Sequence, residues 1–164
     1  MPSLESQIRR LTDRAEILDF LYTYTRHADR LDPDAMVSLF TEDCVVSYIQ
    51  TDPPMLGRDA LYRMLSTYLP NTVSSIHYLA NTQLLFDSDD VVTAQTYMYS
   101  WQRFKAYPAA ADFHRWGQYE LRIVRTPEGW RFTHMRLLNH GEYGGTKIGE
   151  QLGRPWPPIF DNAH

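Results

Sequence analysis

The residue best suited to proton transfer is His77, in the segment 75–81. Strand alternation there places Ser75, His77, Leu79 and Asn81 on one face. Because imidazole titrates near neutral pH, His77 is a candidate general base if this face lines a pocket, and Asn81 is then a candidate substrate-binding residue. The alternative is an ordinary structural histidine with a hydrogen-bond partner, and spacing by itself does not exclude it.

Asp29 is the candidate partner for that base. The segment 4–31 has helical spacing, and a mostly apolar stripe along it ends at Asp29. The helix dipole disfavours a carboxylate near a helix C-terminus, so Asp29 requires a compensating group. His77 would fill this requirement and have its tautomer held in return, whereas Arg26, Arg30 or the following turn are alternative partners. The stripe comprises Leu4, Ile8, Leu11, Ala15, Leu18, Tyr22, Thr25 and Asp29.

Three more candidates lie on predicted strands, and their orientation stays open at this level. The Tyr48 phenol could polarise a substrate carbonyl, or it could be a core aromatic. Trp101 belongs to a face that is either a pocket wall or exposed surface. His134 belongs to another such face, where Arg136 would suit an anionic or carbonyl substrate if it points inward. The first face also carries Tyr97, Tyr99 and Arg103, and the second also carries Phe132, Leu138 and His140.

Composition argues against several other classes of protein. A net charge of −4 and a pI near 5.8 argue against nucleic-acid binding. The single cysteine, Cys44, excludes an internal disulfide, and six scattered histidines without an HExxH pair make a metal site unexpected. Without a glycine-rich phosphate loop, a dinucleotide fingerprint or a Gly-x-Ser-x-Gly elbow, we expect no cofactor and no serine hydrolase chemistry. With no apolar run of membrane-spanning length and no signal core, the expected location is cytoplasmic.

The elements that must position the candidate residues change type along the chain. Helical spacing dominates the first half, where Asp32 and Pro33 form a cap and a first-turn proline. After Pro70 the period becomes two, so helices followed by long antiparallel strands indicate an α+β fold with helices packed on a bent sheet. The predicted elements are helices over 4–31, 33–40 and 58–69 and strands over 43–49, 74–86, 91–107, 116–126 and 130–140, with loops or turns at 51–57, 87–90 and 127–129.

The chain divides into a body and a tail. Residues 1–140 are expected to form one domain, because 164 residues in all is the size of a single domain and no linker interrupts the sequence. Residues 141–164 are rich in glycine and proline and are expected to be irregular. Since Trp156, Ile159 and Phe160 would be unusual in a free tail, we expect this segment to pack on the body or on a neighbouring subunit.

Several sequence blocks, in their order and spacing, resemble the SnoaL-like family of the nuclear transport factor superfamily. The resemblance covers nearly all of the chain before the tail. It implies a cone: helices on a strongly curved, mostly antiparallel sheet that encloses one internal pocket. The blocks are residues 14–19 (RAEILD), 27–32 (HADRLD), 39–46 (LFTEDCVV), 76–81 (IHYLAN) and 124–132 (VRTPEGWRF).

The resemblance also implies roles for individual residues. The arrangement is similar to scytalone dehydratase, the dehydrochlorinase of hexachlorocyclohexane and bile-acid dehydratases, and their catalytic histidine and aspartate match His77 and Asp29. Tyr48 falls at a pocket tyrosine of scytalone dehydratase. Tyr24 stands in the region where the dehydrochlorinase has a lysine. Trp116 begins the segment that matches a second active-site histidine of scytalone dehydratase. The resemblance therefore implies that Tyr24 and Trp116 contact the substrate. Because these positions and Ala28 depart from the family pattern, the substrate is expected to differ from those of all three enzymes.

The resulting hypothesis is a cofactor-independent, dehydratase-like lyase or an isomerase. His77 would abstract a proton next to a carbonyl or other activated carbon of a small, largely apolar molecule, polycyclic or aromatic in type, with Asp29 orienting it. Alternatives are a polyketide-type cyclase, a non-catalytic small-molecule binder, and a structural subunit resembling the small subunit of ring-hydroxylating dioxygenases. The expected partners are a small-molecule substrate and further copies of the chain in a homodimer or homotrimer, with no nucleic acid and no membrane.

Overall fold

The computed structural model describes residues 3–48, 53–105 and 112–144. Helices and two shorter strands precede four long strands, as expected from the change of period. The elements are α1 (Leu4–Asp29), α2 (Pro33–Ser38), β1 (Phe40–Ser47), β2 (Met55–Leu56), α3 (Arg58–Tyr68), the 3₁₀-helix η1 (Leu69–Asn71), β3 (Thr72–Phe86), β4 (Val91–Phe104), β5 (Phe113–Thr126) and β6 (Gly129–Tyr143).

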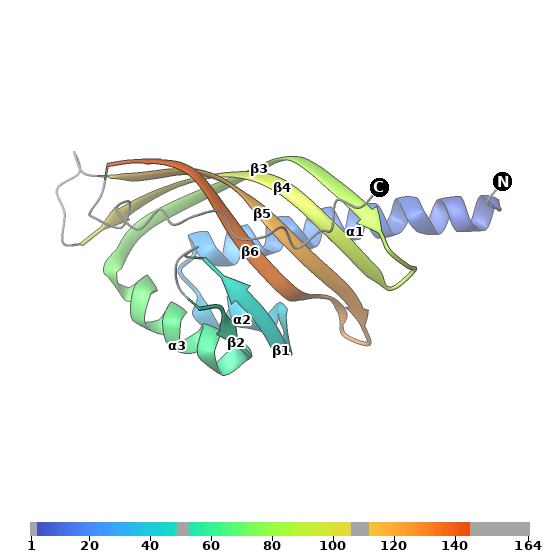
Figure 1. The fold of residues 1–164 in the computed structure, drawn as a ribbon, viewed down its shortest axis with the longest axis horizontal. Helices are drawn as coiled ribbons and strands as arrows, with labels where there is room; N and C mark the ends of the chain where they lie inside the picture. The colour runs from blue at the N-terminus through green and yellow to red at the C-terminus, as the bar shows by residue number, and fades with distance from the viewer. Residues whose placement is uncertain (1–2, 49–52, 106–111, 145–164) are drawn as a thin grey trace.

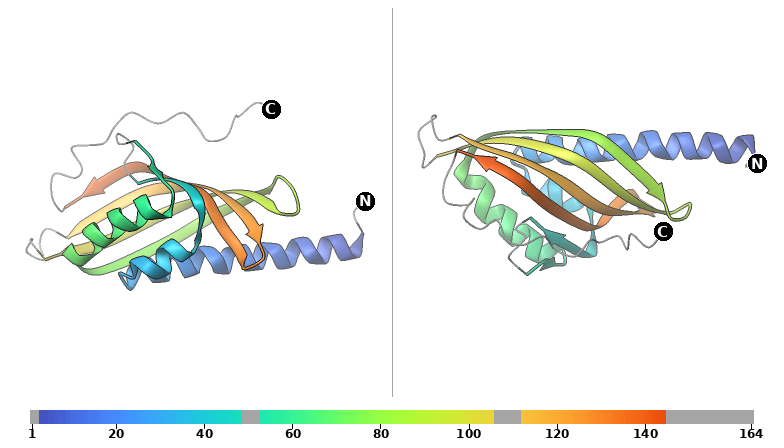
Figure 2. Two further views of the ribbon diagram at one scale, coloured as in Figure 1. Left: turned by 90° about the horizontal axis from the view of Figure 1, so that it is seen from below. Right: turned by 45° about the horizontal axis from the view of Figure 1, so that its top comes forward.

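The six strands form one curved sheet in the order β2-β1-β6-β5-β4-β3. All neighbouring pairs are antiparallel except β1 and β6, which run parallel. Figures 1 and 2 show the sheet bending around α2 and α3, with α1 running beside β3. The predicted α+β cone, with helices on a mostly antiparallel sheet, is confirmed.

Side-chain caps separate the first two helices at the predicted place. Asp32 is the N-cap of α2 and its Oδ1 accepts from Ala35 N at 3.0 Å, with Pro33 as the first helical residue. Leu31 lies between the helices with φ of 58°, a left-handed conformation that ends α1 at Asp29. The helix therefore stops two residues earlier than predicted, and Asp29 lies at its end.

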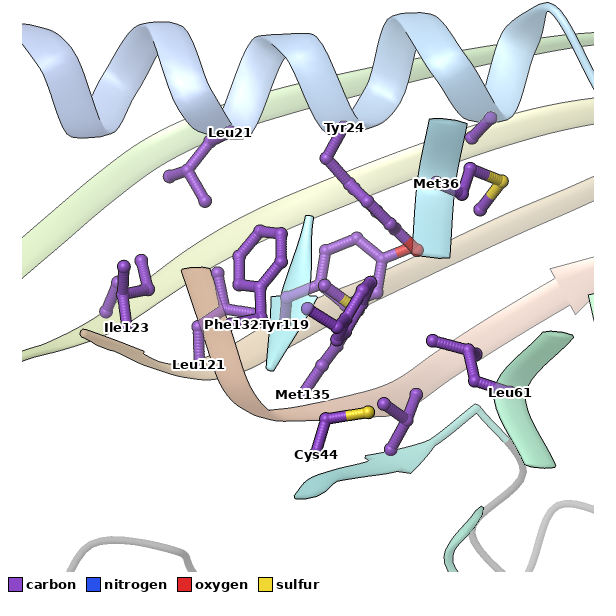
Figure 3. Packing of buried hydrophobic residues seen from close by; sticks show 14 of the residues in the cluster. Leu21, Tyr24, Met36, Cys44, Leu61, Tyr119, Leu121, Ile123, Phe132 and Met135 are labelled. Carbon is purple, nitrogen blue, oxygen red and sulfur yellow. The ribbon is translucent and has the colours of Figure 1, made fainter. Parts of the chain in front are cut away.

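The core lies between the helices and the inner face of the sheet. Figure 3 shows Leu21 and Tyr24 of α1 directed toward Tyr119 of β5 and Phe132 of β6. Fully buried apolar residues of this cluster include Ile17, Phe40, Val46, Leu61, Val92, Ile123 and Phe132. Inner and outer faces of the sheet can therefore be assigned from the strand register and the burial of each residue.

The apolar stripe predicted for α1 is wrong for most of its length. Leu4, Ile8 and Leu11 are 72%, 55% and 67% exposed, because this end of the helix extends beyond the sheet (Figures 1 and 2). The buried face of α1 consists instead of Asp13, Ile17, Leu21, Tyr24, Thr25 and Ala28. Of the stripe, Thr25 is buried, and Leu18 and Asp29 are partly buried.

The last strand continues beyond the expected domain end at residue 140. β6 runs to Tyr143, and its final residues still pair with β5, as His114 with Tyr143 and Arg115 with Glu142. Residues 145–164, for which packing on the body or a neighbour was expected, lie outside the described residues. In the part of the chain that is described, none of the helices is both long and apolar enough to cross a membrane.

Gly117 on β5 provides a test of the close sheet packing. A Cβ at this position would lie 2.5 Å from the backbone oxygen of Leu138 and 3.1 Å from Cδ1 of Leu137. We expect Gly117→Ala to lower the free energy of unfolding by about 1–3 kcal/mol, measured by urea denaturation. The control is Gly141→Ala on β6, where the new Cβ would meet only Trp116 Cε3 at 3.9 Å. Equal losses in both variants would contradict this account.

Candidate active site on the inner face of the sheet

Four polar residues lie side by side across the inner face of the sheet. In register they are His77 of β3, Ser100 of β4, Arg115 of β5 and Glu142 of β6. They share this face with buried apolar residues such as Met98, which pairs with Leu79. The row therefore faces the side of the sheet that the helices cover.

The Asp29 carboxylate joins this row through two contacts with His77. Asp29 Oδ1 lies 2.7 Å from His77 Nδ1, and Asp29 Oδ2 accepts from the His77 backbone N–H at 3.1 Å. The His77 side chain is 10% exposed and that of Asp29 is 27% exposed. Since a carboxylate accepts hydrogen bonds, Nδ1 carries the proton and Nε2 is the ring nitrogen left to act as a base.

A cluster of tyrosine hydroxyls lies close to this pair. Tyr24 and Tyr48 hydroxyls are 2.6 Å apart, and the ring of Tyr119 packs edge-on to Tyr24 with centroids 6.2 Å apart. Tyr24 comes from α1, Tyr119 from the inner face of β5, and Tyr48 directly follows β1. The cluster therefore brings together three elements that are distant in sequence.

Burial keeps these phenols protonated at neutral pH. Desolvation raises the pKa of Tyr24 and of Tyr48 well above the ordinary value, and the contact with Tyr119 adds to the rise for Tyr24. Burial raises the pKa of Tyr119 to about 12, with Arg115 acting against the rise and Asp29 adding to it. Neutral hydroxyls can therefore donate hydrogen bonds to an oxygen on a bound molecule.

An ion pair occupies the other end of the polar row. Arg115 Nε and Nη2 lie 2.8 and 2.7 Å from Glu142 Oε1, and Asn139 Nδ2 donates to the same oxygen. Burial raises the pKa of Tyr68 of α3 to about 12, while the charge of Arg115 acts against the rise and that of Glu142 adds to it. The hydroxyl of Tyr68 donates to Gln102 Oε1 at 3.1 Å.

Asn81 does not share the face of His77, contrary to the expected alternation. Ala80 pairs with Tyr97 and Gln83 with Gln95, so β3 contains one extra residue opposite Thr96. Asn81 sits in this bulge with φ of 53° and is exposed, and the Thr82 hydroxyl takes the inward place 2.7 Å from that of Thr96. The bulge thus moves Asn81 away from the candidate site.

Trp101 and Trp116, predicted at the substrate, lie on the outer face of the sheet. Trp116 is 47% exposed and its ring is tilted against that of Tyr99, with centroids 5.9 Å apart. Trp101 Nε1 donates to Asp112 Oδ2 at 3.2 Å. The residues expected to share the face of Trp101 do so. This face is the outer surface of the sheet, where Tyr97, Tyr99 and Trp116 line an open hollow. The physical reason is register: Trp101 and Trp116 are each one residue away from the inward positions Ser100 and Arg115.

His134 also lies on the outer face, and its predicted grouping with Phe132 is wrong. Ile123 pairs with Phe132 but Arg122 pairs with His134, so Thr133 is an extra residue that reverses the alternation. Phe132 is fully buried in the core, whereas His134 contacts the Thr133 hydroxyl at 3.1 Å. Burial and the charge of Arg122 lower the pKa of His134.

Sequence reasoning missed Ser100, Arg115, Tyr119 and Glu142. In residues 113–126, alternation puts Arg115 on the same face as Phe113, Tyr119 and Leu121. An arginine among such residues is a signal of a buried polar group once that face is known to be the inner one. Glu142 lies on the inner face with Phe132, because the two extra residues of β6, Thr133 and His140, reverse the alternation twice. It was missed because the predicted strand ended at residue 140. Within the described residues, no three His, Cys, Asp or Glu side chains gather closely enough to hold a metal ion.

The buried tyrosines predict a fall in stability at alkaline pH. In the unfolded chain a phenol loses its proton near pH 10, whereas Tyr68 and Tyr119 keep theirs to about pH 12 when folded. The unfolded state therefore binds fewer protons in this range, and the free energy of unfolding should fall as pH rises from about 10 to about 12. Urea denaturation as a function of pH measures this dependence.

A pair of variants tests which tyrosines are responsible. Tyr119→Phe should make the alkaline decline shallower, because one buried phenol no longer contributes to it. Tyr78→Phe removes a hydroxyl from a side chain that is 61% exposed on the outer face and should leave the decline unchanged. The same slope in both variants and in the wild type would rule out the buried cluster as its source.

Solved structures with the same fold carry the names of three types of enzyme. A protein described as a candidate scytalone dehydratase from Novosphingobium aromaticivorans DSM 12444 aligns with a TM-score of 0.80 and 23% identity, over 93% of this chain and 97% of that chain. LinA-type3, a hexachlorocyclohexane dehydrochlorinase from Novosphingobium barchaimii LL02, aligns with a TM-score of 0.73 and 18% identity, over 85% and 94%. A candidate aromatic ring hydroxylase from Novosphingobium aromaticivorans has a TM-score of 0.76 and 23% identity, over 84% and 96%.

These identities establish a shared fold, and the family follows from the sequence itself. No curated protein sequence matches the chain. The profile of the SnoaL-like domain matches residues 9–136, a span that includes most of α1, the whole of β1 to β5, and about half of β6. With this match over most of its length, and with a curved sheet backed by helices, the chain belongs to the SnoaL-like domain family.

Proposed function

We propose that this protein is a lyase or isomerase that works without a cofactor, in which His77 removes a proton from a carbon beside a carbonyl. The observation that carries the proposal is the double contact of Asp29 with His77, at 2.7 Å to the ring and 3.1 Å to the backbone. The ring contact selects the tautomer with a basic Nε2. The backbone contact holds the carboxylate in place independently of the ring.

Asp29 supports the charge that His77 gains during the reaction. When Nε2 takes a proton from carbon, the ring becomes an imidazolium whose Nδ1–H already points at a carboxylate. The opposite charge at hydrogen-bond distance favours this form, which makes the histidine a better base. Proton transfer of this kind typically contributes about 10²–10⁴-fold to a rate.

The electron pair left on carbon passes to the carbonyl oxygen, giving an enolate. In an elimination, the enolate re-forms the carbonyl, a double bond forms between the α and β carbons, and the bond from the β carbon to its hydroxyl oxygen breaks. The imidazolium gives its proton to the departing hydroxide, which leaves as water. In an isomerisation, the same proton returns to a different carbon and nothing leaves. A polyketide-type cyclisation uses the same enolate as a nucleophile toward a second carbonyl carbon.

The tyrosine cluster is suited to stabilise the enolate oxygen. The hydroxyls of Tyr24 and Tyr48 are 2.6 Å apart, and the Tyr24 hydroxyl also interacts with that of Tyr119. Two hydrogen bonds among three hydroxyls use two of the three hydrogens, so one stays available for another acceptor. Burial raises the pKa of all three phenols, so each retains the hydrogen it needs as a donor. Donors held in a buried site stabilise developing charge more strongly than donors in water.

The fold neighbours support an elimination-type reaction. A candidate scytalone dehydratase and a hexachlorocyclohexane dehydrochlorinase, by their names, remove water and hydrogen chloride respectively. Both losses include removal of a proton from carbon, which is the step proposed for His77. The apolar inner face contributed by Leu79, Met98 and Leu137 favours a largely apolar substrate.

Deuterium exchange tests the proton-transfer step without knowledge of the leaving group. The protein is incubated in D₂O with 1-tetralone, 2-tetralone and 1-indanone, and deuterium at the carbon next to the carbonyl is followed by NMR. We expect the wild type to accelerate exchange of at least one ketone, and His77→Gln and Asp29→Asn to reduce that rate by about 10²-fold or more.

The matched control is His134→Gln, which changes a histidine on the outer face and should keep the wild-type rate. His77→Gln is expected to fold, because the contact between Asp29 and the backbone N–H of residue 77 does not depend on the side chain. Wild-type exchange in His77→Gln would overturn the proposal. Binding of these ketones without any exchange by the wild type would also overturn it and would favour a non-catalytic binder.

The expected homodimer or homotrimer stays a prediction. The outer face of the sheet exposes Tyr78, Tyr97 and Trp116 to 61%, 53% and 47%, and aromatic groups of this kind are frequent at protein interfaces. We expect light scattering after size exclusion to give two or three chains per particle, and Trp116→Lys to shift the particle toward one chain. A monomeric wild type at micromolar concentration would contradict the prediction.

A further inference from the structure

Glu142 has one carboxylate oxygen that no neighbouring residue uses. Both contacts of Arg115, at 2.8 and 2.7 Å, and the contact of Asn139 converge on Oε1. Oε2 is buried and has no hydrogen-bond partner among the described residues, and the side chain is only 6% exposed. A buried acceptor without a partner is destabilising and uncommon, so Oε2 calls for a donor that the chain itself does not supply.

The nearest phenol does not satisfy this oxygen. Tyr68 is close enough for Arg115 and Glu142 to act on its pKa, but its hydroxyl donates to Gln102 Oε1 at 3.1 Å. Ser100 and Arg115 lie between Glu142 and His77 in the inner row. Three strand spacings separate the two ends of this row, about 14 Å between backbones and less between side-chain tips.

The charges around Glu142 define which group can bind there. Oε2 accepts a hydrogen bond, so it favours a hydroxyl and offers nothing to an ether or a carbonyl oxygen. The positive charge of Arg115 is already paired with Glu142, so an anionic group would meet the carboxylate without a free cation to compensate it. The site is thus complementary to a neutral molecule that carries a hydroxyl group.

We propose that Glu142 Oε2 accepts a hydrogen bond from a hydroxyl group at the far end of the substrate, with Arg115 and Asn139 as positioning residues. The inference rests on the proposed function for the reacting end, where His77 acts on carbon beside a carbonyl. It narrows the substrate class to neutral ketones with a hydroxyl on a second ring, placed away from the carbonyl. Carboxylated analogues are discriminated against.

Binding of matched tetralones tests this assignment. Dissociation constants are measured by calorimetry at mildly acidic pH, where the phenol is protonated, for 6-hydroxy-1-tetralone, 6-methoxy-1-tetralone and 6-carboxy-1-tetralone. We expect the wild type to bind the hydroxy compound about tenfold or more tightly than either analogue, as a hydrogen bond to a charged acceptor provides. In Glu142→Gln, where a donor amide can replace Oε2, the preference over the methoxy compound should fall below about threefold.

The matched control is Glu120→Gln. Glu120 is also a buried glutamate in contact with an arginine, Arg136, across β5 and β6, but on the outer face. Glu120→Gln should keep the preference for the hydroxy compound over the methoxy compound. Where Glu142→Gln does not fold because Arg115 loses its counter-charge, Arg115→Met combined with Glu142→Gln removes both charges and should lose the preference as well.

Two results would overturn the assignment. One is a wild type that binds the hydroxy and methoxy compounds equally, as expected if only water contacts Oε2. The other is a hydroxyl preference that survives in Glu142→Gln. Failure of the proposed function looks different: exchange at the carbon beside the carbonyl would be absent in the wild type, while the binding preference would still be measurable.

Discussion

The contact between Asp29 and His77 is the constraint on which the candidate site depends, because it joins the end of α1 to the inner face of β3. A carboxylate at a helix C-terminus is unfavourable on its own, and the ring and backbone N–H groups of His77 compensate it. Farther along α1, Asp13 accepts from Arg125 at 2.6 Å. The helix is thus fixed against the sheet at separated points, and its orientation sets where the Asp29 carboxylate lies.

The inner face of the sheet changes character along the strands. Toward one end it is apolar, with Val92, Leu121 and Ile123 packed against α1, and this part supplies hydrophobic stabilisation. Toward the other end the same face carries Ser100 and Arg115 between His77 and Glu142. Buried polar groups are costly unless each has a partner, and here most are paired with one another. One end of the sheet therefore stabilises the fold while the other can perform chemistry.

Strand bulges determine which side chains lie on the inner face of the sheet beside His77. Asn81 in β3, Thr133 in β6 and His140 in β6 are each one residue more than the facing strand has. Each extra residue reverses the alternation beyond it, which exposes Asn81, turns His134 outward and brings Glu142 inward. Alternation read along a single strand assumes an unbroken register, so it wrongly grouped Asn81 with His77 and His134 with Phe132.

The order of elements, the α+β class and the cap at Asp32 were predictable from sequence, because periodicity and capping are local properties of the chain. His77 and Asp29 were also predictable as a pair, since each was anomalous in its own element and the family pattern matched both. Contacts between distant strands were not: the Tyr24–Tyr48 hydroxyl pair and the Arg115–Glu142 ion pair exist only because the sheet curves and bulges bring those residues to one face. Register across a sheet is set by the pairing of whole strands, and only the tertiary structure contains it.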